Sequence, residues 1–131
     1  MYNYPKIPIK SFQDLDVYQK LLAISVAIAK TIKSEKIITL ALDLPIKIAT
    51  AHSSRFGDQT NAIHDLEAVM LNCNLLVVYL EQYRDIENPS AGSGQVETNF
   101  FDQQIKNILS TRTKVLHLQM SWKKFAKEYV K

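Results

Sequence analysis

The residues of this chain best suited to chemistry are the cations of its last segment. Between residues 106 and 131 the sequence holds seven basic side chains, and Glu128 is the only acid among them. The seven are Lys106, Arg112, Lys114, Lys123, Lys124, Lys127 and Lys131. If the segment is helical, all but Lys114 fall within about one third of its circumference, at about 100° per residue. A stripe of one sign is typical of a surface that binds a polyanion.

We therefore predict a nucleic-acid surface that contacts phosphates without reading sequence. Its residues are Lys106, Arg112, Lys123, Lys124, Lys127 and Lys131, with Lys47 and Arg55 as weaker additions. A solvated face is the alternative, although such faces usually mix charges of both signs. Leu109 and Leu116 lie on the same arc as Lys123, so the stripe is also compatible with a subunit interface.

The histidines and the cysteine give no sign of catalysis or metal binding. His52, His64 and His117 do not have the spacing of metal ligands, so we expect no metal site. Cys73 lies on an apolar stripe, which favours a buried small hydrophobe. A Cys–His nucleophile pair is the alternative, but no third group is indicated to orient it. We predict no enzyme and no cofactor; a cryptic site near His52 and His64 is the least favoured interpretation.

Aromatic side chains offer a second route to nucleic acid, because bases of a single strand stack on exposed rings. The candidates are Tyr2, Tyr4, Tyr18, Tyr79, Tyr83, Tyr129 and Trp122. Rings at helical spacing belong more often to a core or an interface. Tyr2 and Tyr4 differ because they precede the first predicted helix.

The composition indicates one folded domain over residues 1–131. The chain is 47% hydrophobic and 22% charged, with a formal net charge of +3, which does not fit a disordered protein. A single cysteine excludes an intrachain disulfide. The first residues lack the pattern of a secretory signal, and no apolar run approaches the ~18–20 residues that span a bilayer. We therefore expect a cytoplasmic protein without a membrane partner.

Four amphipathic segments must position these side chains. Helical spacing predicts helices from Ser11 to about residue 33, from about residue 35 to 55, from about residue 59 to 86, and from residue 97 or 98 to about 129. Residues 1–10 contain two prolines and predict an extended arm, and residues 87–97 predict a flexible loop by composition. Short connections imply an all-α, antiparallel up-down-up-down four-helix bundle.

Local signals mark the ends of these helices. Residues 11–14 resemble a capping box, and Ser34 is a candidate cap for the second helix. Pro45 falls inside the second helix and predicts a kink. Gly57 is placed to end that helix and Asp58 to cap the next one.

Residues 11–20 resemble the opening of a known family, the small four-helix-bundle proteins encoded in intervening sequences of bacterial large-subunit ribosomal RNA genes. Those proteins commonly begin with Phe-x-Asp-Leu-x-Val-Trp-x-Lys. Tyr18 stands where tryptophan is usual, and the matching residues are Phe12, Asp14, Leu15, Val17 and Lys20. The same superfamily includes the accessory variability determinant of diversity-generating retroelements. The proline in residues 45–49 and the following Arg55 are also similar.

The resemblance implies a left-handed bundle that assembles as a ring, pentameric in the relatives. The retroelement relatives bind nucleic acid and a reverse transcriptase through a basic surface, whereas the ribosomal relatives have no established activity. With the basic stripe, it leads to a hypothesis: a non-enzymatic homo-oligomer that binds RNA or DNA. The alternative is a protein-interaction scaffold that recruits an acidic partner protein, with nucleic-acid binding incidental.

Overall fold

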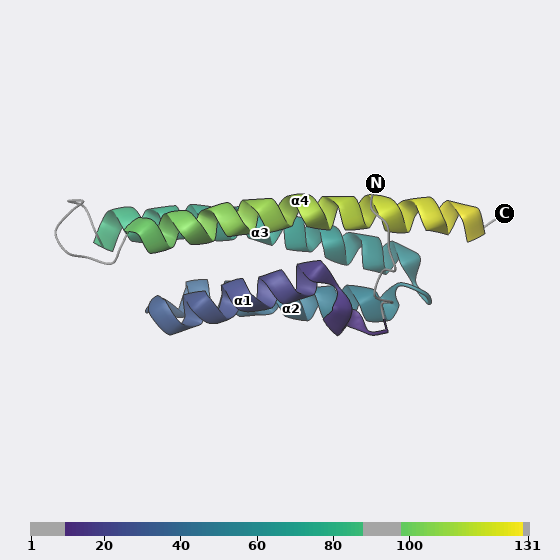
Figure 1. Ribbon diagram of the computed structural model, residues 1–131, viewed down its shortest axis with the longest axis horizontal. Helices are drawn as coiled ribbons and strands as arrows, with labels where there is room; N and C mark the ends of the chain where they lie inside the picture. Colours follow the sequence, from purple (N-terminus) through teal and green to yellow (C-terminus); the bar gives the residue numbers. More distant parts are fainter. Residues whose placement is uncertain (1–9, 88–97, 130–131) are drawn as a thin grey trace.

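The chain folds into a bundle of four helices. The computed structural model describes residues 10–87 and 98–129, with side chains for residues 10–87 and 99–124. The helices are α1 (Asp16–Thr31), α2 (Glu35–Ser54), α3 (Gln59–Glu87) and α4 (Thr98–Tyr129), and the described residues contain no strand (Figure 1). The predicted all-α four-helix bundle is thereby confirmed. The predicted arm and flexible loop lie almost entirely outside the described residues.

The helices follow one another around the bundle in chain order. In Figure 1 the colours along the chain show that each helix runs back against the one before it, with α1 and α2 in one layer and α3 and α4 in the other. Each helix contacts the next, and α1 also contacts α4, which closes the bundle. The α1–α4 contact is the least extensive of the four. The turn between α2 and α3 and the C-terminal part of α4 lie at the same end of the molecule.

The first helix begins later than the sequence predicts. Ser11 and Asp14 do form a capping box, since the Ser11 hydroxyl accepts from the Gln13 amide at 3.1 Å and Asp14 accepts from the Ser11 amide at 3.3 Å. However, the box begins only a 3-10 helix, η1 (Phe12–Asp14). Leu15 then takes extended backbone angles, so α1 starts at Asp16.

The ends of α2 and α3 follow the predicted signals. The Ser34 hydroxyl accepts from the Ile37 amide at 3.3 Å, and Asp58 accepts from the Asn61 amide at 3.1 Å. Each bond satisfies an amide that the first turn of a helix leaves without a partner. Pro45 is buried within α2, which is one element from Glu35 to Ser54. The turn at Gly57 does not use the left-handed backbone that would require glycine.

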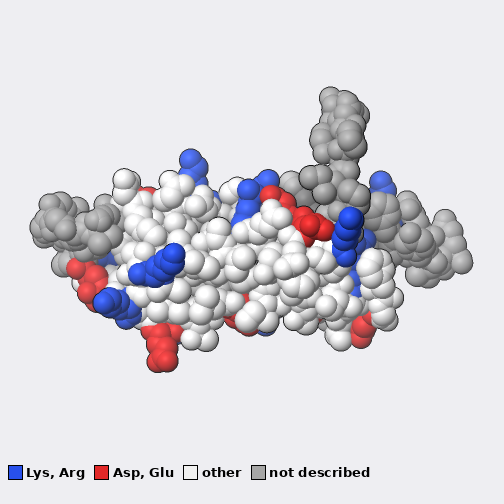
Figure 2. Space-filling view, turned by 60° about the horizontal axis from the view of Figure 1, so that its bottom comes forward, with Lys and Arg blue, Asp and Glu red and all other residues white. Residues whose placement is uncertain are grey.

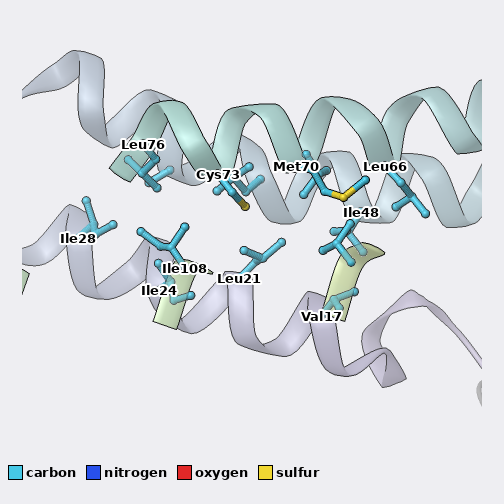
Figure 3. Close-up of a cluster of buried hydrophobic side chains, with 14 of the residues drawn as sticks. Val17, Leu21, Ile24, Ile28, Ile48, Leu66, Met70, Cys73, Leu76 and Ile108 are labelled. Atoms are coloured by element: carbon cyan, nitrogen blue, oxygen red, sulfur yellow. The ribbon is translucent and has the colours of Figure 1, made fainter. Parts of the chain in front are cut away.

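The core runs along the axis between the four helices. Figure 3 shows part of it, where side chains of α1, α2, α3 and α4 meet. Leu21, Ile48, Cys73 and Ile108 are each fully buried there, one from each helix. Burying a side chain such as leucine or isoleucine contributes about 1.5–3 kcal/mol, so this shared core holds the bundle together.

Helix α3 is apolar on more than its buried side. Leu66, Leu76 and Leu80 are fully buried, while Leu71 and Val78 are largely exposed. Among the described residues, α3 is the one helix whose length and composition would allow it to cross a membrane, although the sequence predicts no such segment. About a third of that apolar segment, 33%, is buried in the bundle, and several of its other apolar side chains are exposed.

Candidate nucleic-acid interface

The last members of the basic stripe whose side chains the structure describes are an exposed pair of lysines, where α4 passes the α2–α3 turn. Lys123 and Lys124 directly follow Trp122 and are both exposed. Among the described side chains no acid forms an ion pair with either lysine. As far as the described side chains extend, neither charge is neutralised by an ion pair.

Trp122 fixes this part of α4 against the rest of the bundle. Its side chain is only 2% exposed, although it belongs to one of the most basic stretches of the chain. The Gln59 side-chain amide donates to the Trp122 carbonyl at 3.0 Å, which joins the first residue of α3 to α4. The two lysines thus project from a helix segment that is packed on the turn.

Arg55 brings a third cation to the same place. Its guanidinium carbon lies 4.8 Å from the centre of the Trp122 ring and 4.9 Å from the centre of the Phe56 ring. Cation–π contacts of this kind are worth about 0.5–2 kcal/mol and restrict the guanidinium to the ring faces. The α2–α3 turn therefore sets Arg55 beside the segment that carries Lys123 and Lys124.

The pKa of His52 is affected by the positive charge at this turn. Its ring lies edge-to-face against Phe56, with centroids 6.4 Å apart. Partial burial lowers the pKa of His52 below its ordinary value of about 6.5, and the positive charge of Arg55 lowers it further. The histidine is thus neutral at pH 7 and adds no charge to the cluster there.

One acid lies at the same turn. Asp58 is exposed, and its carboxylate accepts from the Asn61 amide at the start of α3. Among the described side chains, the formal charges of the three cations and this carboxylate sum to about +2, and the carboxylate is directed toward a helix N-terminus, where it is favourable.

The remaining predicted residues are not brought together with this group. Lys106 is exposed but lies 17 residues before Lys123, which places it about 25 Å away along the helix axis. Arg112 is half-buried, and its Nε atom is buried without a hydrogen-bond partner among the described residues. Position 112 flanks the buried positions 108 and 111, so its side chain lies at the edge of the core rather than on a uniform cationic face.

Of the three other predicted residues, one has a different neighbour and two have side chains that the structure does not describe. Lys47 pairs with Asp43 one turn earlier in α2, at 3.3 Å, and is half-buried. The side chains of Lys127 and Lys131 lie outside the described residues. The structure therefore divides the predicted set: Arg55 packs against Trp122, the residue that directly precedes the exposed Lys123 and Lys124.

The groups considered for catalysis are dispersed. Cys73 is fully buried, and burial raises the pKa of its thiol to about 12, against the opposing effect of the Arg112 charge. A thiol with that pKa is not a nucleophile at neutral pH. Within the described ranges, no three of the histidine, cysteine, aspartate and glutamate side chains are placed to share a metal ion.

The described tyrosines serve packing. Tyr18 lies edge-to-face on Phe12 with centroids 4.9 Å apart, the Lys36 ammonium lies 4.3 Å from the Tyr79 ring centre, and the Tyr83 hydroxyl accepts from the Lys33 amide at 3.4 Å.

Among the side chains described at this end, Phe56 is an exposed aromatic ring that the sequence analysis did not select. The available signal was a large apolar residue inside the Arg-Phe-Gly-Asp junction, where no helix face requires it. The sequence alone did not show that the ring points away from the bundle.

A second surface, on α2, is apolar instead of charged. Leu42 and Ile46 form an exposed ridge between two grooves, one of about 840 Å³ toward α3 and one of about 740 Å³ toward α1. Figure 2 views the side where α1 and α2 lie: most of it is uncharged, and its basic and acidic side chains are scattered. We refer to Leu42 and Ile46 with their flanking grooves as the α2 ridge.

Comparison with known proteins gives no relative: no family model, no curated protein and no solved structure matches this chain.

Proposed function

We propose that this protein is a non-enzymatic, homo-oligomeric helical bundle that binds RNA or DNA through phosphate contacts. The observation that carries the proposal is the packing of Arg55 against the buried Trp122, which sets the α2–α3 turn against the segment of α4 that carries the exposed Lys123 and Lys124. Phosphate binding needs cations that are not already neutralised, and the two lysines meet that condition among the described side chains.

The α2 ridge supports the oligomeric part of the proposal. Ile46 is 60% exposed and Leu42 41% exposed, and both line two adjoining apolar grooves. Contiguous apolar surface on a small protein usually marks an interaction site. We assign this ridge to contact with another copy of the chain; the ring of five subunits implied by the family resemblance would multiply the net charge to about +15.

The same ridge favours a second candidate function, the protein-interaction scaffold. In that case a partner protein, such as a reverse transcriptase, covers Leu42 and Ile46. The cationic end of the bundle then serves only solubility, or it contacts acidic residues of that partner. In the first candidate function Lys123 and Lys124 bind phosphates, and in the second they do not. Reversing the charge of these two lysines therefore distinguishes the candidates.

The test is light scattering on a sizing column, with and without a short single-stranded RNA, at low and high salt. The variant carries Lys123→Glu and Lys124→Glu, which changes the charge of each chain by −4, from +3 to −1. We expect it to keep its mass and to lose RNA retention. Log K falls as log salt rises, and for single strands each lost phosphate contact makes this slope shallower by about 0.7. The loss of two contacts should therefore make it shallower by about 1.4.

The matched control carries Lys30→Glu and Lys33→Glu. Both lysines are exposed and lie where α1 ends, at the other end of the bundle from the α2–α3 turn, and the charge change is identical (Figure 1). Equal loss in both variants would mean that only net charge matters. Binding that is insensitive to salt would refute phosphate contact, and loss of the oligomer in the first variant alone would place the lysines in a subunit interface.

A further inference from the structure

Phe56 is the most exposed large apolar side chain among the described residues, at 80%. It lies in the α2–α3 turn, two residues after Ser54, which lines the α1-side groove of the α2 ridge, and no helix face requires an apolar residue at this point. Single exposed apolar residues are common on protein surfaces, so exposure alone is not informative. The contacts around the ring distinguish it from an ordinary exposed residue.

The ring is held in place by a chain of contacts that begins in the core. The Trp122 ring, which is buried, lies 4.8 Å from the Arg55 guanidinium, and the same guanidinium lies 4.9 Å from the Phe56 ring. His52 adds an edge-to-face contact with Phe56. Phe56 therefore has defined neighbours on the protein side, while most of its surface faces solvent.

The position of this ring matches what a single strand requires. Unpaired bases stack on exposed aromatic side chains, and the phosphates beside them need cations. Lys123 and Lys124 follow directly after Trp122, the residue against which Arg55 is packed. A base on Phe56 would thus lie beside Arg55, and its strand could continue toward the α4 segment with Lys123 and Lys124, whereas the stacked pairs inside a duplex offer no free face to the ring.

We propose that Phe56 is a stacking platform for an unpaired base of single-stranded RNA or DNA, with Arg55 packed against the ring and Lys123 and Lys124 on the adjoining segment of α4. The proposal rests on the proposed function and adds to it a preference for single strands over duplex. It also assigns this preference to one side chain that carries no charge.

The test compares a dye-labelled single-stranded oligonucleotide with its duplex by fluorescence anisotropy. We expect Phe56→Ala to weaken single-strand binding about 5- to 150-fold, the range for loss of one base stack, and to leave duplex binding and the salt dependence unchanged. Phe56→Trp restores an aromatic face, so it should bind as wild type does, and its added fluorescence should be quenched by the single strand.

The control is Ile86→Ala, which removes another exposed apolar side chain, 73% exposed, near the opposite end of α3. It should change neither affinity. Because Phe56 is exposed, we expect Phe56→Ala to fold, and its thermal unfolding monitored by circular dichroism verifies this.

The outcomes separate the two proposals. If the wild-type protein binds neither oligonucleotide, the proposed function fails and the stacking platform with it. If the wild-type protein binds with a salt dependence but Phe56→Ala keeps the same preference for single strands, only the stacking platform is overturned. A change in the mass of Phe56→Ala on light scattering would also overturn it, because the ring would then belong to a subunit contact.

Discussion

Trp122→Ala tests whether the α2–α3 turn is held to α4 as the site requires. The side chain is 2% exposed, and the full removal of such a buried ring costs about 3–5 kcal/mol. Loss of the contact with Arg55 is included in that figure, at about 0.5–1 kcal/mol. The hydrogen bond from Gln59 reaches the Trp122 carbonyl, so it does not depend on the side chain directly.

This free energy converts to a large change in melting temperature. At about 2.1 cal/mol/K per residue, the unfolding entropy of 131 residues is about 0.28 kcal/mol/K. Trp122→Ala is therefore expected to lower Tm by about 11–18 °C. Trp122→Phe keeps a ring against Arg55, so we expect a loss of only about 1–2 kcal/mol.

The assay is thermal unfolding by circular dichroism at fixed protein concentration, with Met120→Ala as the control. Met120 precedes Trp122 by two residues and is 57% exposed, so its truncation should change stability by no more than about 0.5 kcal/mol. If Trp122→Ala and Met120→Ala melt at the same temperature, the tryptophan does not pack as described. Its contact with Arg55, and with it the packing of the α2–α3 turn against α4, would then be wrong.

Four further changes test other parts of the structure. Gly57→Ala should raise stability by about 0.4–1 kcal/mol in urea unfolding, because the backbone there is not left-handed and an added Cβ meets no atom within 4 Å; a loss of stability would contradict this geometry. The Cys73 thiol, buried and with a pKa of about 12, should resist iodoacetamide at pH 8 until the protein is denatured, and mass spectrometry detects any earlier adduct. Because the pKa of His52 is lowered in the folded protein, stability should fall as pH drops below the unfolded value of about 6.5, and His52→Gln should show a smaller decrease in Tm between pH 7 and 5.5. Gln104 is buried with its Oε1 atom unpaired among the described residues, so Gln104→Leu should stabilise the protein by about 1–3 kcal/mol and raise Tm by about 4–11 °C, whereas a lower Tm would mean that the oxygen has a partner.

The sequence by itself determined the helices and most of their ends. Spacing of apolar residues depends only on the helical period, and capping by Ser34 and Asp58 depends on contacts within a few residues. The start of the first helix was placed too early, because the capping box of Ser11 and Asp14 fits a 3-10 helix as well as an α-helix. Cys73 was also identified as buried from its position on an apolar stripe.

The tertiary structure decided which cations act together. A helical projection places Arg112 and Lys123 on one arc of α4. The burial of each side chain depends, however, on which neighbouring helix packs against it. Arg112 is half-buried and Lys123 is exposed. Arg55 joins Lys123 and Lys124 only because the α2–α3 turn folds against Trp122, a contact between residues 67 positions apart in the sequence. The exposure of Phe56 also depends on this packing, because the ring contacts Arg55, which packs against Trp122. Local sequence fixes helices because their hydrogen bonds are local, whereas a surface site depends on how distant segments pack.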